Sequence, residues 1–335
     1  MRWGLVGASD IAATRMVPAM RAVGHEVVAV ASGSVEWART YAQRHGIGFA
    51  TDRLTAMLDR TDIDAVYISS LNDRHRAQTE AAAAAGKHVL CEKPLALSLD
   101  DGDTMVRACE SAGVVFATNH PLPGAGPHRA IRDLVHGGAI GDLLGVRVSH
   151  AKLLPERLRG WRLDEVPGAG VILDITVHDA SVLNPLLGVP AVDAVATAVR
   201  QGTWEAVVGV PSSVEDAVMA TVRYKGDVLV SVHDAFTVGF GHTGLEVYGT
   251  RGTIVAPEAM TGDPNGAVLL RNRSGEREID VADRRDPVQI LLAAFADAVA
   301  GTGTPTVTGR DGVRALAVAL AVREAATTGH RVLVG

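Results

Sequence analysis

Short apolar runs alternate with helix-forming stretches over the first 120 residues of the chain. The apolar runs are typical of buried strands and lie at Trp3–Val6, Glu26–Ala31, Ala65–Ser69, Val89–Cys91 and Val114–Thr118. The stretches between them predict helices at Ile11–Val23, Val35–His45, Leu54–Arg60, Asp73–Ala85 and Leu99–Ser111. Strands that alternate with helices form parallel sheets covered on both faces. Residues 1–120 therefore predict an α/β domain with a doubly wound parallel sheet.

The pattern changes after Asn119, where prolines and glycines crowd the chain up to Pro127. Strand patterns then follow one another with few helices between them, at Leu143–His150, Ala194–Gln201, Ala217–Tyr224, Val228–Asp234, Gly244–Tyr248, Thr253–Val255 and Val268–Leu270. Successive strands of this kind predict a largely antiparallel, open sheet, hence an α+β domain over residues 121–335. The turn Lys225-Gly226-Asp227 predicts a hairpin. We expect the last two helices, Pro287–Val299 and Asp311–Thr327, to pack on the first domain.

Composition narrows the class of protein. The net charge of −6 gives no reason to expect nucleic acid or an anionic membrane as partner. Two cysteines without a metal-ligand spacing fit a reducing compartment, and no apolar stretch approaches the roughly 20 residues of a membrane span. Because the residues from Arg2 already form the first strand and its turn, we do not expect a signal peptide. These features predict a cytoplasmic globular protein.

The first strand leads into a glycine-containing turn, Gly7-Ala8-Ser9-Asp10-Ile11-Ala12. A G-x-G-x-x-G/A turn at this position is typical of dinucleotide-binding Rossmann folds, in which the pyrophosphate lies at the helix N-terminus. Ser9 replaces the second glycine, and its hydroxyl is small enough to allow a phosphate to approach and can donate a hydrogen bond to it. A plain strand-turn-helix junction without ligand is the alternative, which the βαβ context disfavours.

The tip of the second strand bears on cofactor choice. NAD-binding folds usually carry an acidic residue there, which binds the ribose 2′-hydroxyl. Here the tip has Ser32 and Gly33, with no carboxylate before Glu36, and Arg39 follows as a possible counter-charge. Hydroxyl and backbone N–H groups can donate hydrogen bonds to a 2′-phosphate, which a carboxylate would repel. We therefore expect NADP(H) to be preferred, with NAD(H) possible.

Two further motifs carry candidate chemistry. Glu92-Lys93-Pro94 ends a buried strand, where charges are uncommon unless they are used, although a solvated lysine is the ordinary alternative. Asp174 and His178 are four residues apart on a predicted helix, Asp174–Leu187, and so share one face. This pair suits acid–base work, a structural ion pair or half a metal site, and the lack of a nearby ligand disfavours metal. The sequence has no G-x-S-x-G elbow of a hydrolase.

Three motifs occur in a fixed order along the chain: Gly7-Ala8-Ser9, Glu92-Lys93-Pro94, and the spaced set Gly170, Asp174, His178. With them the chain resembles the Gfo/Idh/MocA family of NAD(P)-dependent oxidoreductases over essentially its whole length. The likeness implies NADPH-dependent reduction of a sugar-derived ketone, such as 1,5-anhydro-D-fructose, to the alcohol. It implies that Lys93 stabilises charge on the reacting oxygen, that His178 is the acid/base and that Asp174 holds sugar hydroxyls or the histidine.

The resemblance also implies a set of binding residues. Cofactor contacts would come from the first turn (Gly7, Ala8, Ser9, Asp10, Ile11), the second strand tip (Ser32, Gly33, Arg39), the turn after the fourth strand (Ser69, Ser70, Leu71, Asn72, His75), and Glu92, Lys93, Asn119, Trp161 and Arg162. Lys93, His120, Asp174 and His178 would touch the substrate. Two places depart from the family: Trp37 occupies the position of an arginine that serves the 2′-phosphate, and the stretch 121–126 is less polar than expected.

Two other functions stay open. One is an inositol-type or sugar dehydrogenase that works in the oxidative direction with NAD(P). The other is a non-catalytic regulator that senses dinucleotides, which would have no need of Lys93, Asp174 and His178 together. The sequence does not decide between a monomer and a homo-oligomer.

Overall fold

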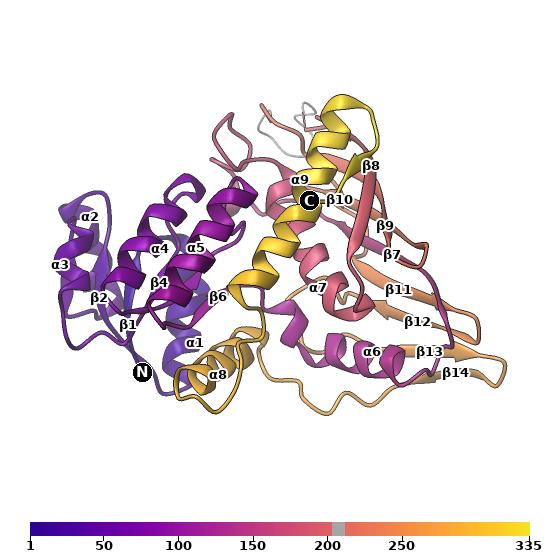
Figure 1. Cartoon of the computed structure of the whole chain (residues 1–335), viewed down its shortest axis with the longest axis horizontal. Helices are drawn as coiled ribbons and strands as arrows, with labels where there is room; N and C mark the ends of the chain where they lie inside the picture. Colours follow the sequence, from indigo (N-terminus) through magenta and orange to yellow (C-terminus); the bar gives the residue numbers. More distant parts are fainter. Residues whose placement is uncertain (203–211) are drawn as a thin grey trace. The chain divides into compact units, whose positions relative to one another are not determined.

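The computed structural model describes residues 1–202 and 212–335 (Figure 1). The chain divides into two compact units, which we describe separately. Unit 1 comprises Met1–Pro121 and Val288–Val313, and unit 2 comprises Leu122–Pro287 and Arg314–Gly335. The predicted domain boundary after residue 120 lies next to the first division, and the segment Val288–Val313 returns to unit 1. No helix within the described residues has both the length and the apolar composition of a membrane span.

Unit 1, all of whose residues are described, is built on a six-stranded parallel sheet in the order β3-β2-β1-β4-β5-β6. Its strands are β1 (Arg2–Val6), β2 (Glu26–Ala31), β3 (Phe49–Thr51), β4 (Ala65–Ile68), β5 (His88–Cys91) and β6 (Phe116–Thr118). The order reverses between β1 and β4, and ligands of such sheets bind beyond the strand carboxyl ends at this switch point. The predicted doubly wound sheet is confirmed, with β3 as an edge strand that the sequence pattern did not reveal.

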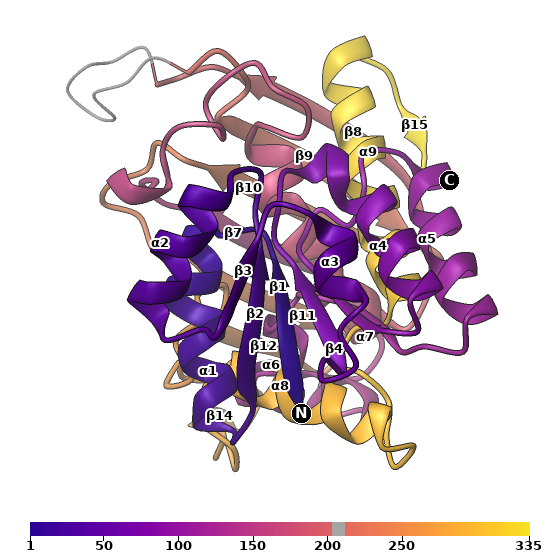
Figure 2. The ribbon, with the colours of Figure 1, turned by 90° about the vertical axis from the view of Figure 1, so that its left-hand side faces the viewer.

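Helices flank the strands of unit 1 on both sides (Figure 2). They are α1 (Val17–Ala22), α2 (Val35–His45), α3 (Leu54–Leu58), α4 (His75–Ala84), α5 (Leu99–Ser111) and α8 (Pro287–Val299), with a π-helical segment at Ala12–Met16 and a 3-10 turn at Asn72–Arg74. Ser34 and Ser98 cap α2 and α5 through their side chains. From α8, the Phe295 ring packs 5.2 Å from that of Trp3, so this distant segment completes the core.

Unit 2 holds a mixed sheet in the order β14-β13-β12-β11-β7-β10-β9-β8-β15. Its strands among the described residues are β7 (Leu143–Ala151), β8 (Ala191–Val199), β9 (Ala217–Tyr224), β10 (Val228–Ala235), β11 (Gly244–Gly249), β12 (Gly252–Pro257), β13 (Leu269–Asn272), β14 (Gly275–Glu278) and β15 (Val332–Leu333). All described neighbours pair antiparallel except β7 and β10, which are parallel. The prediction of a largely antiparallel sheet is confirmed.

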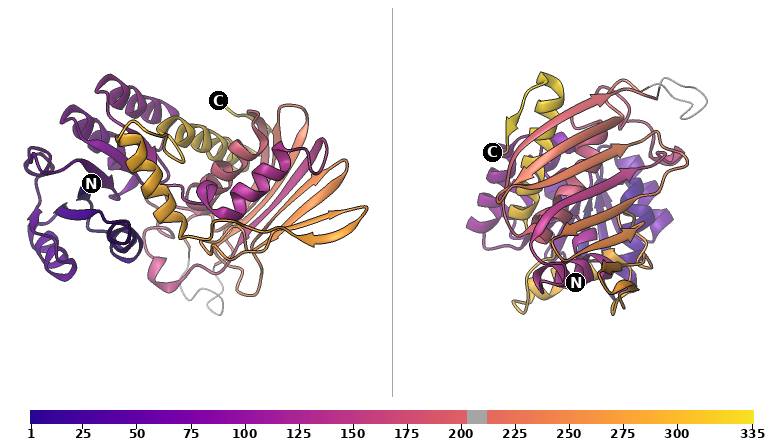
Figure 3. Two further views of the ribbon diagram at one scale, coloured as in Figure 1. Left: turned by 90° about the horizontal axis from the view of Figure 1, so that it is seen from below. Right: turned by 90° about the vertical axis from the view of Figure 1, so that its right-hand side faces the viewer.

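The helices of unit 2 lie on one side of this sheet, whose other face is turned to the viewer in the right-hand panel of Figure 3. They are α6 (Gly126–His136), α7 (Val177–Leu187) and α9 (Gly309–Thr328), with a π-helical segment at Ile172–Thr176 and 3-10 turns at Leu122–Gly124 and Glu156–Leu158. The first residues of α9 belong to unit 1, but from Arg314 on this helix groups with unit 2. The predicted hairpin joins β9 to β10, where Gly226 and Asp227 both adopt positive φ.

Candidate active site

The turn after β1 requires glycine at its first position. Gly7 has a φ of 109°, and a Cβ added to it would lie 2.9 Å from backbone atoms of Ser69 and Ser70 in the turn after β4. Its N–H donates to the Ala31 carbonyl at 2.8 Å, at the end of β2. Gly7 thus brings the ends of three neighbouring strands together at the switch point of the sheet.

The Ser9 side chain already has partners in this structure. Its Oγ accepts the N–H of Ala12 at 3.1 Å, and its hydroxyl donates to Ser69 Oγ at 2.8 Å. The Ser69 hydroxyl in turn donates to the Gly7 carbonyl at 3.4 Å. We predicted that Ser9 would donate to a phosphate, but its proton here ties the two turns to each other. To receive a hydrogen bond from Ser9, a phosphate would have to replace Ser69 Oγ as the acceptor.

Two side chains of α2 orient the peptide groups of the turn. The Trp37 indole N–H donates to the Ala8 carbonyl at 3.2 Å, and the Tyr41 hydroxyl donates to the Ser9 carbonyl at 3.2 Å. Burial and the nearby Asp10 raise the pKa of Tyr41 to about 12, so it remains a donor at neutral pH. Because C=O and N–H point in opposite directions across a trans peptide, the N–H groups of Ser9 and Asp10 are directed away from α2. Such N–H groups at a helix N-terminus fit the pyrophosphate of a dinucleotide.

The turn after β4 is fixed from beneath by His75, which is fully buried. Its Nδ1 lies 3.1 Å from the Pro94 carbonyl oxygen and 3.3 Å from that of Leu95, and its Nε2 lies 3.3 Å from the Ser70 carbonyl oxygen. Burial lowers the pKa of His75, so the ring is neutral and has a single N–H, which donates either from Nδ1 to the Pro94 and Leu95 carbonyls or from Nε2 to the Ser70 carbonyl. We predicted a cofactor contact for His75, and within the protein its ring lies between this turn and the Lys93-Pro94 turn.

The remaining predicted residues of these turns differ in exposure. Ser69 and Asn72 are buried, whereas Leu71 is half exposed. The Ser70 hydroxyl donates to Gln78 Oε1 at 2.5 Å, which fastens the turn to α4. At the tip of β2, Ser32 is half-buried, while Gly33 and Arg39 are exposed.

Glu92 is held by donors from three parts of unit 1. Its Oε1 accepts the Tyr67 hydroxyl and the Asn119 amide N–H, each at 2.5 Å, and its Oε2 accepts the Lys93 backbone N–H at 3.1 Å. Tyr67 lies in β4, Glu92 follows β5 and Asn119 follows β6. The Glu92 carboxylate therefore fixes the turn that carries Lys93. Burial and the adjacent Glu92 raise the pKa of Tyr67 well above its usual value, which keeps it protonated.

Lys93 is half-buried and close to His120. His120 is almost fully buried, and its burial together with the nearby Lys93 ammonium lowers the pKa of His120 to about 3. The pair therefore carries one positive charge at neutral pH, located on the lysine. Asn119, the residue before His120, has a buried Oδ1 with no hydrogen-bond partner among the described residues. An acceptor of this kind suits an amide donor such as a nicotinamide carboxamide.

In unit 2, Asp174 lies inside the π-helical segment that precedes α7 and is almost fully buried. Arg162 Nε donates to Asp174 Oδ2 at 3.1 Å, and the Arg162 guanidinium stacks 4.6 Å from the centre of the Trp161 ring. We predicted that Trp161 and Arg162 contact the cofactor. Within unit 2, Arg162 compensates the buried charge of Asp174.

His178 is half-buried in the first turn of α7 and has a buried polar network beside it. The His150 ring centre lies 6.4 Å from that of His178, and His150 Nδ1 is 2.8 Å from Asp179 Oδ1. Asp234 accepts the Thr176 hydroxyl at 2.6 Å. Burial raises the pKa of Asp179 to about 7. Burial and the facing Asp179 carboxyl raise the pKa of Asp234 well above its usual value. Asp234 is therefore protonated. Its proton, shared with Asp179, provides a hydrogen bond for Asp234 Oδ1 and Asp179 Oδ2, neither of which has another partner among the described residues.

Glu215 is another residue that the sequence did not reveal. A Cβ added to Gly170, whose φ is 94°, would lie 2.1 Å from Glu215 Oε1. Glycine at this position therefore lets the carboxylate of Glu215 approach the N-terminus of the helix that carries Asp174 and His178. The Ile172 backbone N–H contributes to holding it there, while burial raises the pKa of Glu215.

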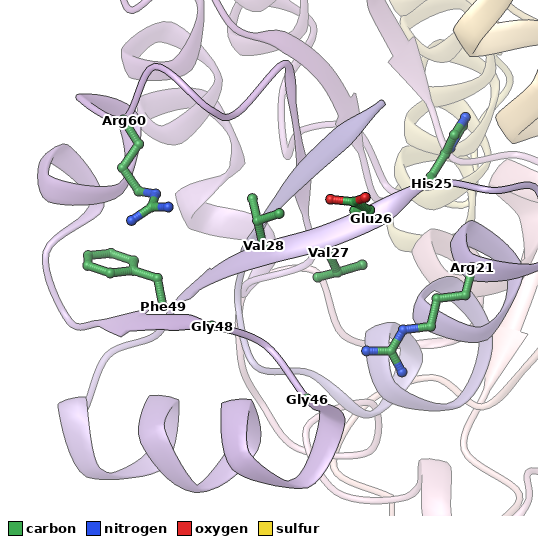
Figure 4. Close-up of a pocket in the computed structure, with 9 residues that line it drawn as sticks. All are labelled: Arg21, His25, Glu26, Val27, Val28, Gly46, Gly48, Phe49 and Arg60. Carbon is green, nitrogen blue, oxygen red and sulfur yellow. The ribbon is translucent and has the colours of Figure 1, made fainter.

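One pocket of the described structure lies away from these turns. A pocket of about 510 Å³ lies at the amino ends of β2 and β3, the edge opposite the switch point (Figure 4). Its arginines are engaged within the protein, since Arg21 donates to the His45 carbonyl and Arg60 pairs with Asp62 at 2.6 Å. Within residues 1–202 and 212–335, no three His, Cys, Asp or Glu side chains are grouped as metal ligands.

Comparison with known proteins identifies relatives of the whole chain. A family model described as an oxidoreductase family with an NAD-binding Rossmann fold matches residues 1–120, and the GFO/IDH/MocA C-terminal domain matches residues 128–255. A 1,5-anhydro-D-fructose reductase from Ensifer adhaerens is 47% identical over 98% of this chain and 97% of its own. A dTDP-3,4-didehydro-2,6-dideoxy-alpha-D-glucose 3-reductase from Streptomyces violaceoruber is 32% identical over 95% and 91%. The fold is that of the aldose-aldose oxidoreductase from Caulobacter crescentus, solved with glycerol, at a TM-score of 0.86 and 24% identity over 99% of both chains.

Proposed function

Because the chain belongs to the Gfo/Idh/MocA family of oxidoreductases, we propose that it reduces a ketone derived from a sugar to the alcohol, with NADPH as reductant. The observation that carries this proposal is the position of Lys93. Its ammonium stands beside a neutral histidine, in a turn fixed by Glu92, at the sheet edge where Gly7 and Ser69 form the dinucleotide turn. A positive donor at that edge suits a carbonyl oxygen on which negative charge develops.

When bound, the nicotinamide supplies the hydride that the carbonyl carbon accepts. Lys93 donates a hydrogen bond to the carbonyl oxygen and stabilises its growing negative charge. His178 gives that oxygen its proton, which completes the alcohol. Asp174, paired with Arg162, accepts hydrogen bonds from sugar hydroxyls or orients His178.

The preference for NADPH rests on the tip of β2. Ser32, Gly33 and Ser34 carry no charge, whereas NAD-binding folds usually have a carboxylate there for the ribose 2′-hydroxyl. The substrate class rests on the relative from Ensifer adhaerens, whose name specifies 1,5-anhydro-D-fructose and whose sequence is 47% identical to this one. We propose the same ketone, or a close analogue with a sugar ring, for this chain.

An NADPH-oxidation assay against 1,5-anhydro-D-fructose, related keto-sugars and matched polyols tests the proposal, with NADH run in parallel. We expect turnover of a keto-sugar with NADPH and slower turnover with NADH. Faster oxidation of polyols than reduction of any ketone would favour the sugar dehydrogenase. Binding of NADPH with no turnover across the panel would favour the dinucleotide-sensing regulator.

A further inference from the structure

An arginine that the sequence patterns did not single out reaches the tip of β2. The Nη1 atom of Arg74 lies 3.9 Å from the position that a Cβ on Gly33 would occupy. Gly33 follows β2, Arg74 ends the 3-10 turn after β4, and β1 lies between these two strands. Strands two places apart are about 9.6 Å from each other. The Arg74 side chain therefore extends across the mouth of the turn that begins at Gly7.

The Arg74 guanidinium is available to a ligand. Arg74 is exposed, and its side chain has no hydrogen bond or ion pair among the described residues. The Arg74 backbone N–H donates to the Leu71 carbonyl at 3.0 Å, which fixes the base of the side chain. A guanidinium presents a planar set of N–H donors that matches two oxygens of a phosphate.

The neighbouring residues at the tip of β2 support this role. Ser34 accepts the Trp37 backbone N–H at 3.3 Å, and its hydroxyl proton can still be donated, as can those of the Ser32 hydroxyl and the Gly33 backbone N–H at the same strand tip. Gly33 is exposed, and its lack of a side chain leaves room for a ligand group next to the guanidinium. A dinucleotide places its adenosine ribose at this strand tip.

Arg39, the counter-charge that we predicted from the sequence, is less well placed. Trp37 and Tyr41 bond to the glycine turn and so define the side of α2 that faces it. Arg39 is two residues from each of them, or about 200° around the helix. Its side chain therefore leaves α2 on the far side, and the cation that lies beside Gly33 comes from the turn after β4 instead.

We propose that Arg74 binds the 2′-phosphate of NADPH and is the main residue that distinguishes NADPH from NADH. This inference rests on the proposed function, because it assumes that the dinucleotide occupies the turn at Gly7. It also explains how a chain with Trp37 in α2 keeps a cation for the 2′-phosphate: the cation is supplied by a different strand end.

Equilibrium binding tests the inference without turnover. Dissociation constants for NADP+ and NAD+ are measured by calorimetry on the full chain, and adenosine 2′,5′-bisphosphate is compared with AMP as a pair that differs only in the 2′-phosphate. The variants are Arg74→Gln, Arg74→Lys and Arg39→Gln, with Arg44→Gln as a matched change of another exposed arginine. Thermal unfolding of each variant verifies that it is folded.

For Arg74→Gln we expect a dissociation constant for NADP+ that is higher by on the order of 10- to 100-fold, with the NAD+ value unchanged within about twofold. In Arg74→Gln the affinity for adenosine 2′,5′-bisphosphate should fall by the same factor, and the affinity for AMP should not change. The affinity of Arg74→Lys for NADP+ should lie between those of Arg74→Gln and the unchanged protein. Arg39→Gln and Arg44→Gln should bind like the unchanged protein. The proposed role of Arg74 would be wrong if Arg74→Gln bound NADP+ as tightly as the unchanged protein, or if Arg39→Gln lost more affinity for NADP+ than Arg74→Gln did. The proposed function would stand in either case. Failure of the unchanged protein to bind either dinucleotide would overturn both.

Discussion

The Tyr67 hydroxyl donates to the Glu92 carboxylate at 2.5 Å, and this bond joins the middle of β4 to the residue that follows β5. Tyr67 is fully buried, and Glu92 also accepts the backbone N–H of Lys93. The orientation of Lys93 thus depends on a tyrosine that has no direct part in the reaction.

We predict that Tyr67→Phe lowers kcat while changing the affinity for NADPH little. The substitution removes one of the two donors to Glu92 Oε1, leaves only the Asn119 amide there, and loosens the turn that holds Lys93. Loss of one partner of a buried, charge-assisted hydrogen bond should also lower the free energy of unfolding by about 1–3 kcal/mol. Steady-state kinetics with separate NADPH titrations measure the first effect and denaturant unfolding the second. A variant with unchanged kcat would show that Glu92 does not need Tyr67 to position Lys93.

Gly7→Ala should destabilise unit 1 and weaken dinucleotide binding. The new methyl group would lie 2.9 Å from backbone atoms of the turn after β4, which cannot move aside as a flexible side chain would. Gly86→Ala is the matched control, because Gly86 also has a positive φ (69°) but has nothing within 4 Å of its added Cβ. We expect the control to lose roughly 1–2 kcal/mol from the positive φ alone, and Gly7→Ala to lose more. Equal losses in the two variants would contradict the close approach of the two turns.

The buried carboxyl pair of unit 2 predicts a pH dependence of stability. The pKa of Asp179 in the folded protein is raised to about 7, and that of Asp234 is raised well above its usual value. The folded protein therefore binds protons that the unfolded chain releases near pH 4. Stability from these groups is fully present below about pH 4 and is lost as the pH rises toward and through 7.

Asp234→Asn isolates this effect, because an asparagine can accept from Thr176 and donate to Asp179 without titrating. We expect the fall in unfolding free energy between pH 5 and 8 to be shallower in the variant by up to about 1.4 kcal/mol per pH unit. Chemical denaturation at a series of pH values measures the slope. Identical slopes for the variant and the unchanged protein would show that Asp234 does not hold a proton in the fold.

The features predicted from the sequence are those that a short stretch of chain determines. Gly7 follows a strand and precedes a helix, and Lys93 ends a strand, so each could be assigned to the carboxyl edge of a parallel sheet from its own neighbours. The contacts that the sequence did not reveal join residues whose proximity depends on strand order. Arg74 meets Gly33 only because β1 lies between β2 and β4.

The same reason explains contacts of single residues that the sequence did not predict. His75 has the right place in the chain for a cofactor contact, but its ring faces the carbonyls of Pro94 and Leu95, which the pairing of β4 with β5 brings beneath it. Asp234 continues the series of inward-facing positions Val228, Val230 and Val232 in β10, and only its proximity to Asp179 shows why a carboxyl group is tolerated there. The sequence pattern did not reveal β3 or β15, which have three and two residues.

The most direct test of the account compares the unchanged protein with Lys93→Met, which keeps much of the side-chain length and removes the charge. Reduction of 1,5-anhydro-D-fructose by NADPH is followed in single turnover, and the dissociation constant of NADPH is measured on the same samples. We predict that the rate of hydride transfer falls by about 100-fold or more, while NADPH binds within a few fold of the unchanged protein. A Lys93→Met variant that still reduced the ketone at the original rate would contradict the central claim that this lysine stabilises the reacting oxygen.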